Sequence, residues 1–188
     1  MKTNYSNKQK LQRLTTAAIL AALSLVLMAT VRFPFPLAPF YEFEFSDFPL
    51  LICSVTVGPV YSIVSLFVVC LIQTLVFSSS SGFIGFVMHF VASGLMILTV
   101  YTARKFIKGA KGVIISDILG VVVMTLVMIP MNMWRTSVFM NLPVNEFISG
   151  YLGICVLFNT LKSSSNIIIY TILSPIVSKQ YNKIFIKE

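Results

Sequence analysis

The feature that most constrains this chain is the succession of long apolar segments that fills most of it. A membrane-spanning helix needs about 20 predominantly apolar residues. Five segments approach or exceed this length, at residues 14–31, 59–77, 83–103, 113–134 and 148–176. A sixth segment, residues 48–57, is too short to cross a bilayer by itself. We therefore expect an all-α integral membrane protein with six transmembrane helices, the second one short, in a single membrane domain spanning residues 1–188.

The composition argues against a soluble domain. Of 188 residues, 57% are hydrophobic and 11% are charged, whereas soluble domains carry about 25% charged residues. A soluble fold of this size leaves roughly a third of its unfolded surface exposed, so it could not hide so much apolar area.

The basic residues are distributed unevenly along the chain. Eleven of the 14 Lys and Arg residues lie in residues 1–13, 104–112 and 177–188. Cytoplasmic loops of membrane proteins carry an excess of Lys and Arg. We therefore expect a cytoplasmic N-terminal segment, a basic cytoplasmic loop and a cytoplasmic tail, with the segment 32–47 outside the cell. This topology accounts for the net charge of +8 without a nucleic-acid partner.

The segment "FPFPLAPFYEFEFSDFP", residues 33–49, is unusual beside the apolar segments that flank it. Its prolines predict a stiff, extended chain. From Tyr41 to Ser46 aromatic and polar residues alternate, which gives one apolar face and one polar face. Ser46 or Asp47 could cap the second helix. We interpret the segment as a lid over an outward-facing cavity, with Tyr41, Phe45 and Asp47 as candidate contacts; an interfacial aromatic belt is the alternative.

A lysine lies within the last apolar segment. Charged side chains inside a spanning helix are costly and usually mark function. Asn159 precedes Lys162 by three residues and Asn166 follows it by four, so the three side chains share one helix face. We predict that Asn159 and Lys162 contact a ligand.

Three further polar residues are expected at a similar depth in the membrane. They are Gln73 in the third segment, His89 in the fourth and Asn132 in the fifth. Amides can hydrogen-bond to the polar edges of a planar ring, and aromatic side chains can pack on its faces. The set therefore suggests a site for a planar, hydrogen-bonding small molecule.

Several common signatures are absent from the sequence. There is no P-loop motif, no His/Cys metal cluster and no pair of intramembrane carboxylates. Cys53, Cys70 and Cys155 lie singly in apolar runs, and we assign them no disulfide and no metal. We expect no enzymatic activity, no intrinsic cofactor and a partner that supplies energy. An intramembrane hydrolase that uses His89 and Ser93 is the alternative from another class.

The first apolar segment offers a surface for such a partner. It contains two pairs of alanines at a spacing of four, which lets another helix approach closely. The four residues are Ala17, Ala18, Ala21 and Ala22. Packing within this chain would use the same residues.

Together these residues resemble the substrate-binding S component of energy-coupling factor (ECF) vitamin transporters, over nearly the whole chain. The resemblance rests on the Phe-Pro-rich segment after the first helix and the "GPV" that opens the third. It is closest to the riboflavin-specific branch, whose Asp-Phe-Ser-Asp-like motif reads Glu44, Phe45, Ser46 and Asp47 in this chain.

The resemblance implies a bacterial plasma-membrane subunit that captures a vitamin from outside. Such a subunit then topples in the bilayer on a transmembrane coupling protein driven by two ATPases, and the alanine-rich face of its first helix docks there. In the flavin-binding branch, an asparagine in helix five and an Asn-x-x-Lys in helix six match Asn132, and Asn159 with Lys162.

Two departures from the riboflavin branch leave the cargo open. The branch often has a lysine in helix three, where this chain is apolar around Val69, and an asparagine in helix four near the position of His89. Riboflavin is the leading ligand; the alternatives are a flavin nucleotide, pantothenate, another vitamin or a tetrapyrrole bound through His89.

Overall fold

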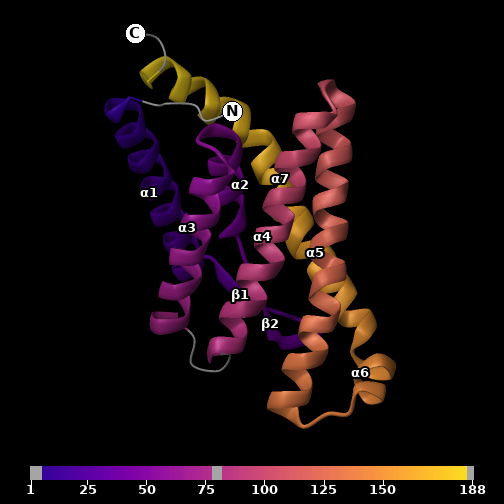
Figure 1. The fold of residues 1–188 in the computed structure, drawn as a ribbon. Coiled ribbons are helices and arrows are strands. Elements are labelled where there is room, and N and C mark those ends of the chain that lie inside the picture. Colours follow the sequence, from indigo (N-terminus) through magenta and orange to yellow (C-terminus); the bar gives the residue numbers. More distant parts are fainter. Residues whose placement is uncertain (1–5, 78–81, 186–188) are drawn as a thin grey trace.

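A computed structural model describes residues 6–77 and 82–185, and it is mostly helical (Figure 1). Within these ranges, five helices are long and apolar enough to cross a membrane. They are α1 (Asn7–Thr30), α3 (Pro59–Ile72) with its π-helical continuation η1 (Gln73–Phe77), α4 (Gly82–Phe106), α5 (Gly109–Met140) and α7 (Leu152–Phe185). Residues 78–81, together with Lys2 and Lys187, lie outside the described residues.

The short helix α2 (Asp47–Thr56) lies inside the bundle, where it packs against α1, α3, α4 and α7. Eight of its ten residues are buried. A helix that is apolar on all sides suits such a surrounded position. The predicted cap by Ser46 is wrong, because its side chain makes no capping hydrogen bond.

The segment after α1, expected to be a stiff, extended chain, is a β-hairpin. Strands β1 (Arg32–Phe35) and β2 (Ala38–Glu44) pair antiparallel, with Phe33 opposite Phe43 and an irregularity after Pro34. Proline is tolerated here because both strands of a two-stranded sheet have a free edge. The extended chain predicted from the sequence is therefore a strand, but its burial does not alternate as predicted, since Glu44 of the expected polar face is buried.

The chain between α5 and α7 also differs from expectation. Helix α5 runs to Met140 and ends at Asn141, which adopts a left-handed conformation with φ 50°. A separate short helix, α6 (Val144–Gly150), follows, and α7 begins at Leu152 rather than at residue 148. Left-handed C-caps favour Gly or Asn, which explains why α5 ends at Asn141.

Two apolar clusters form the interior. The larger one joins α2 to the surrounding long helices. The smaller one joins the hairpin to α6 and α7, and its buried members are Phe35, Ala38, Tyr41, Phe147, Cys155 and Phe158. The hairpin is thus packed on the bundle by its aromatic side chains.

The corner between β2 and α2, residues 44–48, is buried and hydrogen-bonded to distant helices. The Asn166 amide accepts from the Phe48 backbone N–H and donates to the Glu44 carbonyl, both at 3.1 Å. The Ser24 hydroxyl donates to the Ser46 carbonyl at 2.7 Å. Ser46 lies between β2 and α2, and Phe48 lies in the first turn of α2, where backbone N–H groups have no partner within the helix. The Asn166 and Ser24 side chains therefore satisfy backbone groups at the junction of the two elements.

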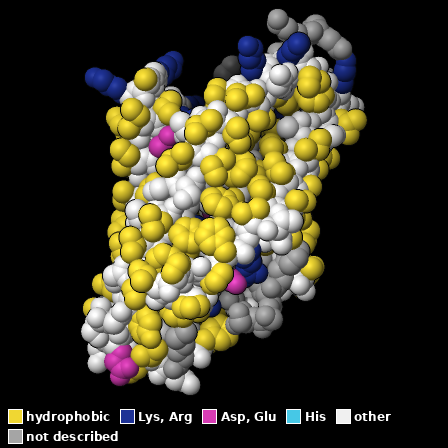
Figure 2. Space-filling model, turned by 180° about the vertical axis from the view of Figure 1, so that it is seen from behind, with side chains coloured by type: hydrophobic (Ala, Val, Ile, Leu, Met, Phe, Trp, Pro, Cys, Tyr) yellow, Lys and Arg dark blue, Asp and Glu magenta, His cyan; other side chains and the backbone are white. Residues whose placement is uncertain are grey.

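Lysine and arginine gather at one end of the bundle (Figure 2). The ends of α1 and α7 nearest the termini and the turn between α4 and α5 lie at that end (Figure 1). The predicted loop 104–112 is much shorter, since α4 ends at Phe106 and α5 begins at Gly109. At this end Asp117 pairs with Arg104 at 2.8 Å and accepts from Thr171 at 2.6 Å.

Replacing Asn166 by Ala should destabilise the fold. The change leaves the Phe48 N–H and the Glu44 carbonyl unpaired in the interior, at a cost of about 2–4 kcal/mol. We expect a clearly lower midpoint of thermal unfolding in detergent. Ser165→Ala is the matched control, because its hydroxyl bonds only to Leu161 within its own helix. Equal midpoints for the two variants would contradict this role of Asn166.

Candidate binding pocket

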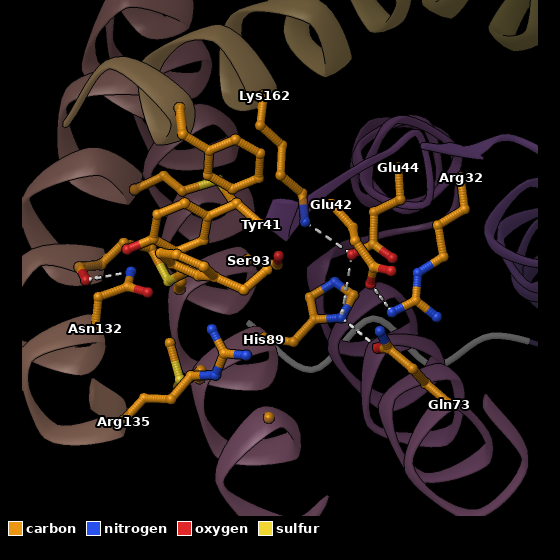
Figure 3. A pocket seen from close by; sticks show the side chains of 17 residues that line it. Arg32, Tyr41, Glu42, Glu44, Gln73, His89, Ser93, Asn132, Arg135 and Lys162 are labelled. Atoms are coloured by element: carbon orange, nitrogen blue, oxygen red, sulfur yellow. Dashed lines mark hydrogen bonds and ion pairs between the residues drawn. The ribbon is translucent and has the colours of Figure 1, made fainter. Parts of the chain in front are cut away.

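A pocket of about 120 Å³ opens between the hairpin, η1, α4, α5 and α7 (Figure 3). Both polar and apolar side chains line it. The lining residues are Arg32, Phe40, Tyr41, Glu42, Glu44, Gln73, Gly85, Met88, His89, Ala92, Ser93, Met124, Met128, Asn132, Arg135, Phe158 and Lys162.

A buried ion pair forms one side of the pocket. The Lys162 Nζ lies 2.8 Å from the Glu44 Oε1, and both residues are under 10% exposed. Burial by itself would raise the pKa of the Glu44 carboxyl, but the nearby charges of Lys162 and His89 hold that pKa below its ordinary value. The pair joins the end of β2 to the middle of α7.

Glu44 is a pocket residue that the contacts predicted from the sequence do not include. The sequence does indicate that an acidic residue belongs to this site, because a lysine inside a membrane needs a counter-charge. The sequence contains three carboxylates in the segment after α1, at residues 42, 44 and 47, and periodicity alone does not say which one reaches Lys162.

His89 links three elements beside this pair. Its Nδ1 lies 2.6 Å from the Gln73 Oε1, and its Nε2 lies 3.1 Å from the Asp47 Oδ1. The Glu44 Oε1 is 3.9 Å from Nδ1. Gln73, His89 and Asp47 therefore meet as one cluster, although Asp47 itself lies behind His89 and does not line the pocket.

Aromatic rings form the wall under the hairpin. The rings of Tyr41 and Phe158 stack, with centroids 4.8 Å apart and planes 11° from parallel. Phe43 meets Phe158 edge-on at 5.1 Å. Burial raises the pKa of the Tyr41 hydroxyl, so this group keeps its proton. No oxygen or nitrogen partner for it is found among the described residues, and the Cys155 thiol lies beside it.

The opposite wall comes from α5. Asn132 is 1% exposed and donates from Nδ2 to the Met128 carbonyl at 2.8 Å. Arg135 and Arg32 also line the pocket. Arg32 forms an ion pair with Glu42 across the hairpin.

Five of the eight predicted contacts line the pocket, namely Tyr41, Gln73, His89, Asn132 and Lys162. The other three lie nearby without lining it. Asn159 is fully buried and donates to the Cys155 carbonyl at 2.8 Å, while its own Oδ1 has no partner in the described chain. Phe45 packs against the larger core cluster.

Ser93, which the hydrolase alternative pairs with His89, also lines the pocket. The His89 nitrogens, however, face Gln73 and Asp47 instead of Ser93.

The four alanines of α1 divide between two faces. Ala17 and Ala21 are buried against the rest of this chain. Ala18 and Ala22 are exposed. A partner could therefore reach the second pair directly, whereas the first pair packs within the bundle.

The chain is similar to transport proteins of known function. FmnP, a riboflavin transporter of Bacillus subtilis (strain 168), is 33% identical over 125 residues, and the match covers 65% of each of the two chains, just under two thirds. RibU, a riboflavin transporter of Staphylococcus aureus (strain TCH60), is 33% identical over 174 residues, which cover 91% of this chain and 86% of the relative.

A solved structure described as "Structure and mechanism of the S component of a bacterial ECF transporter" shares this fold. The TM-score is 0.64 at 25% sequence identity, and the match covers 95% of this chain and 99% of the other. Residues 12–178 match the family described as ECF transporter, substrate-specific component. This match over most of the chain, with the similarity to RibU and the common fold, shows that the protein belongs to the substrate-specific components of ECF transporters.

Proposed function

We propose that this chain is the substrate-capturing subunit of an ECF importer in a bacterial plasma membrane and that its ligand is riboflavin. The observation that carries the proposal is the pocket around the buried Lys162–Glu44 pair. The similarity to riboflavin transporters of two bacteria supports the choice of ligand.

The chemistry of the pocket suits a flat ring with polar edges. The Tyr41 and Phe158 rings and the Met124 and Met128 side chains offer apolar contact. The Asn132 amide and the Lys162 ammonium can hydrogen-bond to carbonyl and ring-nitrogen groups. Pockets of this kind combine an apolar lining with a few placed polar groups.

The hairpin acts as the cover in this proposal. The pocket volume, about 120 Å³, is below the roughly 300–1,000 Å³ of most ligand sites. A flavin-sized molecule therefore needs the hairpin to move outward. The hairpin can do so by sliding its aromatic side chains over Phe158, while Asn166 and Ser24 keep the corner 44–48 in place.

The basic end of the bundle indicates how the protein is oriented in the membrane. Cytoplasmic loops are enriched in Lys and Arg, so we place both termini and the α4–α5 turn in the cytoplasm. The hairpin and α6 then lie on the outer side, and the pocket receives its ligand from outside. In this topology α2 counts as the sixth, short membrane helix beside the five long ones.

The energy for release comes from partners in this proposal. The sequence has no P-loop, and the family name implies a larger transporter. We place the contact with a transmembrane coupling protein, itself driven by two ATPases, on the exposed face of α1 that carries Ala18 and Ala22.

Replacing Lys162 by Ala should weaken riboflavin binding about 10- to 100-fold, since a lost hydrogen bond to a charged group costs about 1.5–3 kcal/mol. Quenching of riboflavin fluorescence by purified protein measures the affinity. Lys179→Ala, on the exposed end of α7, is the control and should bind like the unmodified chain. If Lys162→Ala binds equally well, the site assignment fails; if the unmodified chain does not bind riboflavin, the ligand assignment fails.

Replacing Ala18 by Trp should leave riboflavin binding intact and abolish uptake into cells that contain the whole transporter. The indole adds bulk on a face where close helix approach needs small residues. Uptake of labelled riboflavin and binding by the purified variant are the two measurements. Ile19→Trp is the control, because Ile19 is also exposed but points about 100° away around the helix. Unchanged uptake by Ala18→Trp would place the contact elsewhere.

A further inference from the structure

Asp47 is a buried carboxylate that needs a counter-charge. It is 0% exposed at the start of α2. Two neighbouring carboxylates already have cations, since Glu44 pairs with Lys162 and Glu42 pairs with Arg32. The ion pair found for Asp47 in the described chain is with His89. A buried charge is stable only when it is paired, so this histidine has to supply the positive charge.

The hydrogen bonds of the His89 ring point to the same protonation state. Both partners of the ring nitrogens are oxygens, the Gln73 Oε1 at 2.6 Å from Nδ1 and the Asp47 Oδ1 at 3.1 Å from Nε2. A neutral imidazole has one N–H and one acceptor nitrogen, whereas an imidazolium donates from both. An imidazolium satisfies both oxygens at once.

The groups that face this ring come from every neighbouring element. Asp47 belongs to α2 and Glu44 to β2, and both are acidic. Gln73 of η1 and Cys70 of α3 also face the ring. Lys162 of α7 is bound to Glu44. With His89 positive, the buried group of two carboxylates and two cations is neutral.

Through these contacts His89 ties α4 to the corner that carries the hairpin. Figure 3 shows its ring between Gln73 and the carboxylate of Glu44, with Lys162 on the far side of that carboxylate. The corner is fixed to α7 by Asn166 and to α1 by Ser24. His89 adds the connection to α4 and η1, which form the other rim of the pocket.

We propose that His89 is a positioning residue for ligand capture: as an imidazolium it holds Asp47 and Glu44 in place beneath the hairpin, and so keeps the hairpin closed over bound riboflavin. The identity of the ligand, riboflavin, rests on the proposed function. The effect of His89 on the hairpin does not depend on that function. Loss of the proton leaves the buried group with an unbalanced negative charge. The closed hairpin is therefore favoured at lower pH and loosened as the pH rises.

His89→Gln tests the charge, because glutamine still donates a hydrogen bond but carries no charge. We expect riboflavin to dissociate about tenfold faster or more, since removal of one partner leaves the Asp47 charge buried and uncompensated. The double variant with Asp47→Asn replaces the ion pair by two neutral amides. It should return the dissociation rate to within about threefold of the original.

The pH profile gives a second readout that a packing role would not produce. In the unmodified chain, riboflavin dissociation should accelerate from mildly acidic to alkaline pH, because histidine is the group that changes charge there. In the double variant this acceleration should disappear. Asp117→Asn is the matched control: it neutralises a carboxylate that also pairs with a cation, Arg104, but lies outside the pocket. It should leave both the rate and its pH profile unchanged.

Hydrogen exchange of the hairpin amides without ligand separates this inference from the proposed function. Exchange in residues 38–44 should rise in His89→Gln and fall again in the double variant. If this pattern holds while the unmodified chain binds no riboflavin, the positioning role stands and the ligand is wrong. If His89→Gln leaves exchange and dissociation unchanged, or Asp47→Asn fails to restore them, the positioning role is overturned.

Discussion

The ion pair between Lys162 and Glu44 constrains the other elements of this structure, because an ammonium buried in an apolar bundle must be matched by a carboxylate within reach. Glu44 can reach α7 only if the chain after α1 turns back into the bundle. The hairpin makes that turn, and β2 ends where Glu44 meets Lys162. The short α2 follows from the same requirement, since it starts already inside the bundle and has room for ten residues.

The buried polar groups on the hairpin side of the bundle are connected rather than scattered. Asn166 satisfies the backbone of the corner, Lys162 neutralises Glu44, and His89 neutralises Asp47. Each of these side chains comes from a long helix and acts on the corner between hairpin and α2. In the proposal above, the paired charges of this corner hold the hairpin closed over the ligand. In the proposed function, the hairpin is the cover and the Lys162–Glu44 pair is the binding group of a subunit that captures its ligand and hands it on.

The far end of the bundle is organised differently. Arg104, Asp117 and Thr171 join α4, α5 and α7, and the Arg104 guanidinium lies 4.4 Å from the centre of the Tyr170 ring. These contacts hold the three helices together at the basic end, away from the hairpin. The pocket therefore belongs to one half of the molecule, and the proposed route for the ligand leads past the hairpin rather than through the basic end.

Length and hydropathy determined from sequence alone that the chain is a helical membrane protein and that a short segment follows the first long one, because these properties are local. The sequence also placed Lys162 inside an apolar segment, where a charge is costly. Family resemblance added the transporter class, which the comparisons confirmed. Only the tertiary structure decided that residues 32–44 form a hairpin, that Glu44 rather than Glu42 reaches Lys162, and that Asn159 stands behind the pocket wall. Those outcomes depend on strand pairing and on which helix faces meet, and contacts between residues more than a hundred positions apart leave no periodic trace in the sequence.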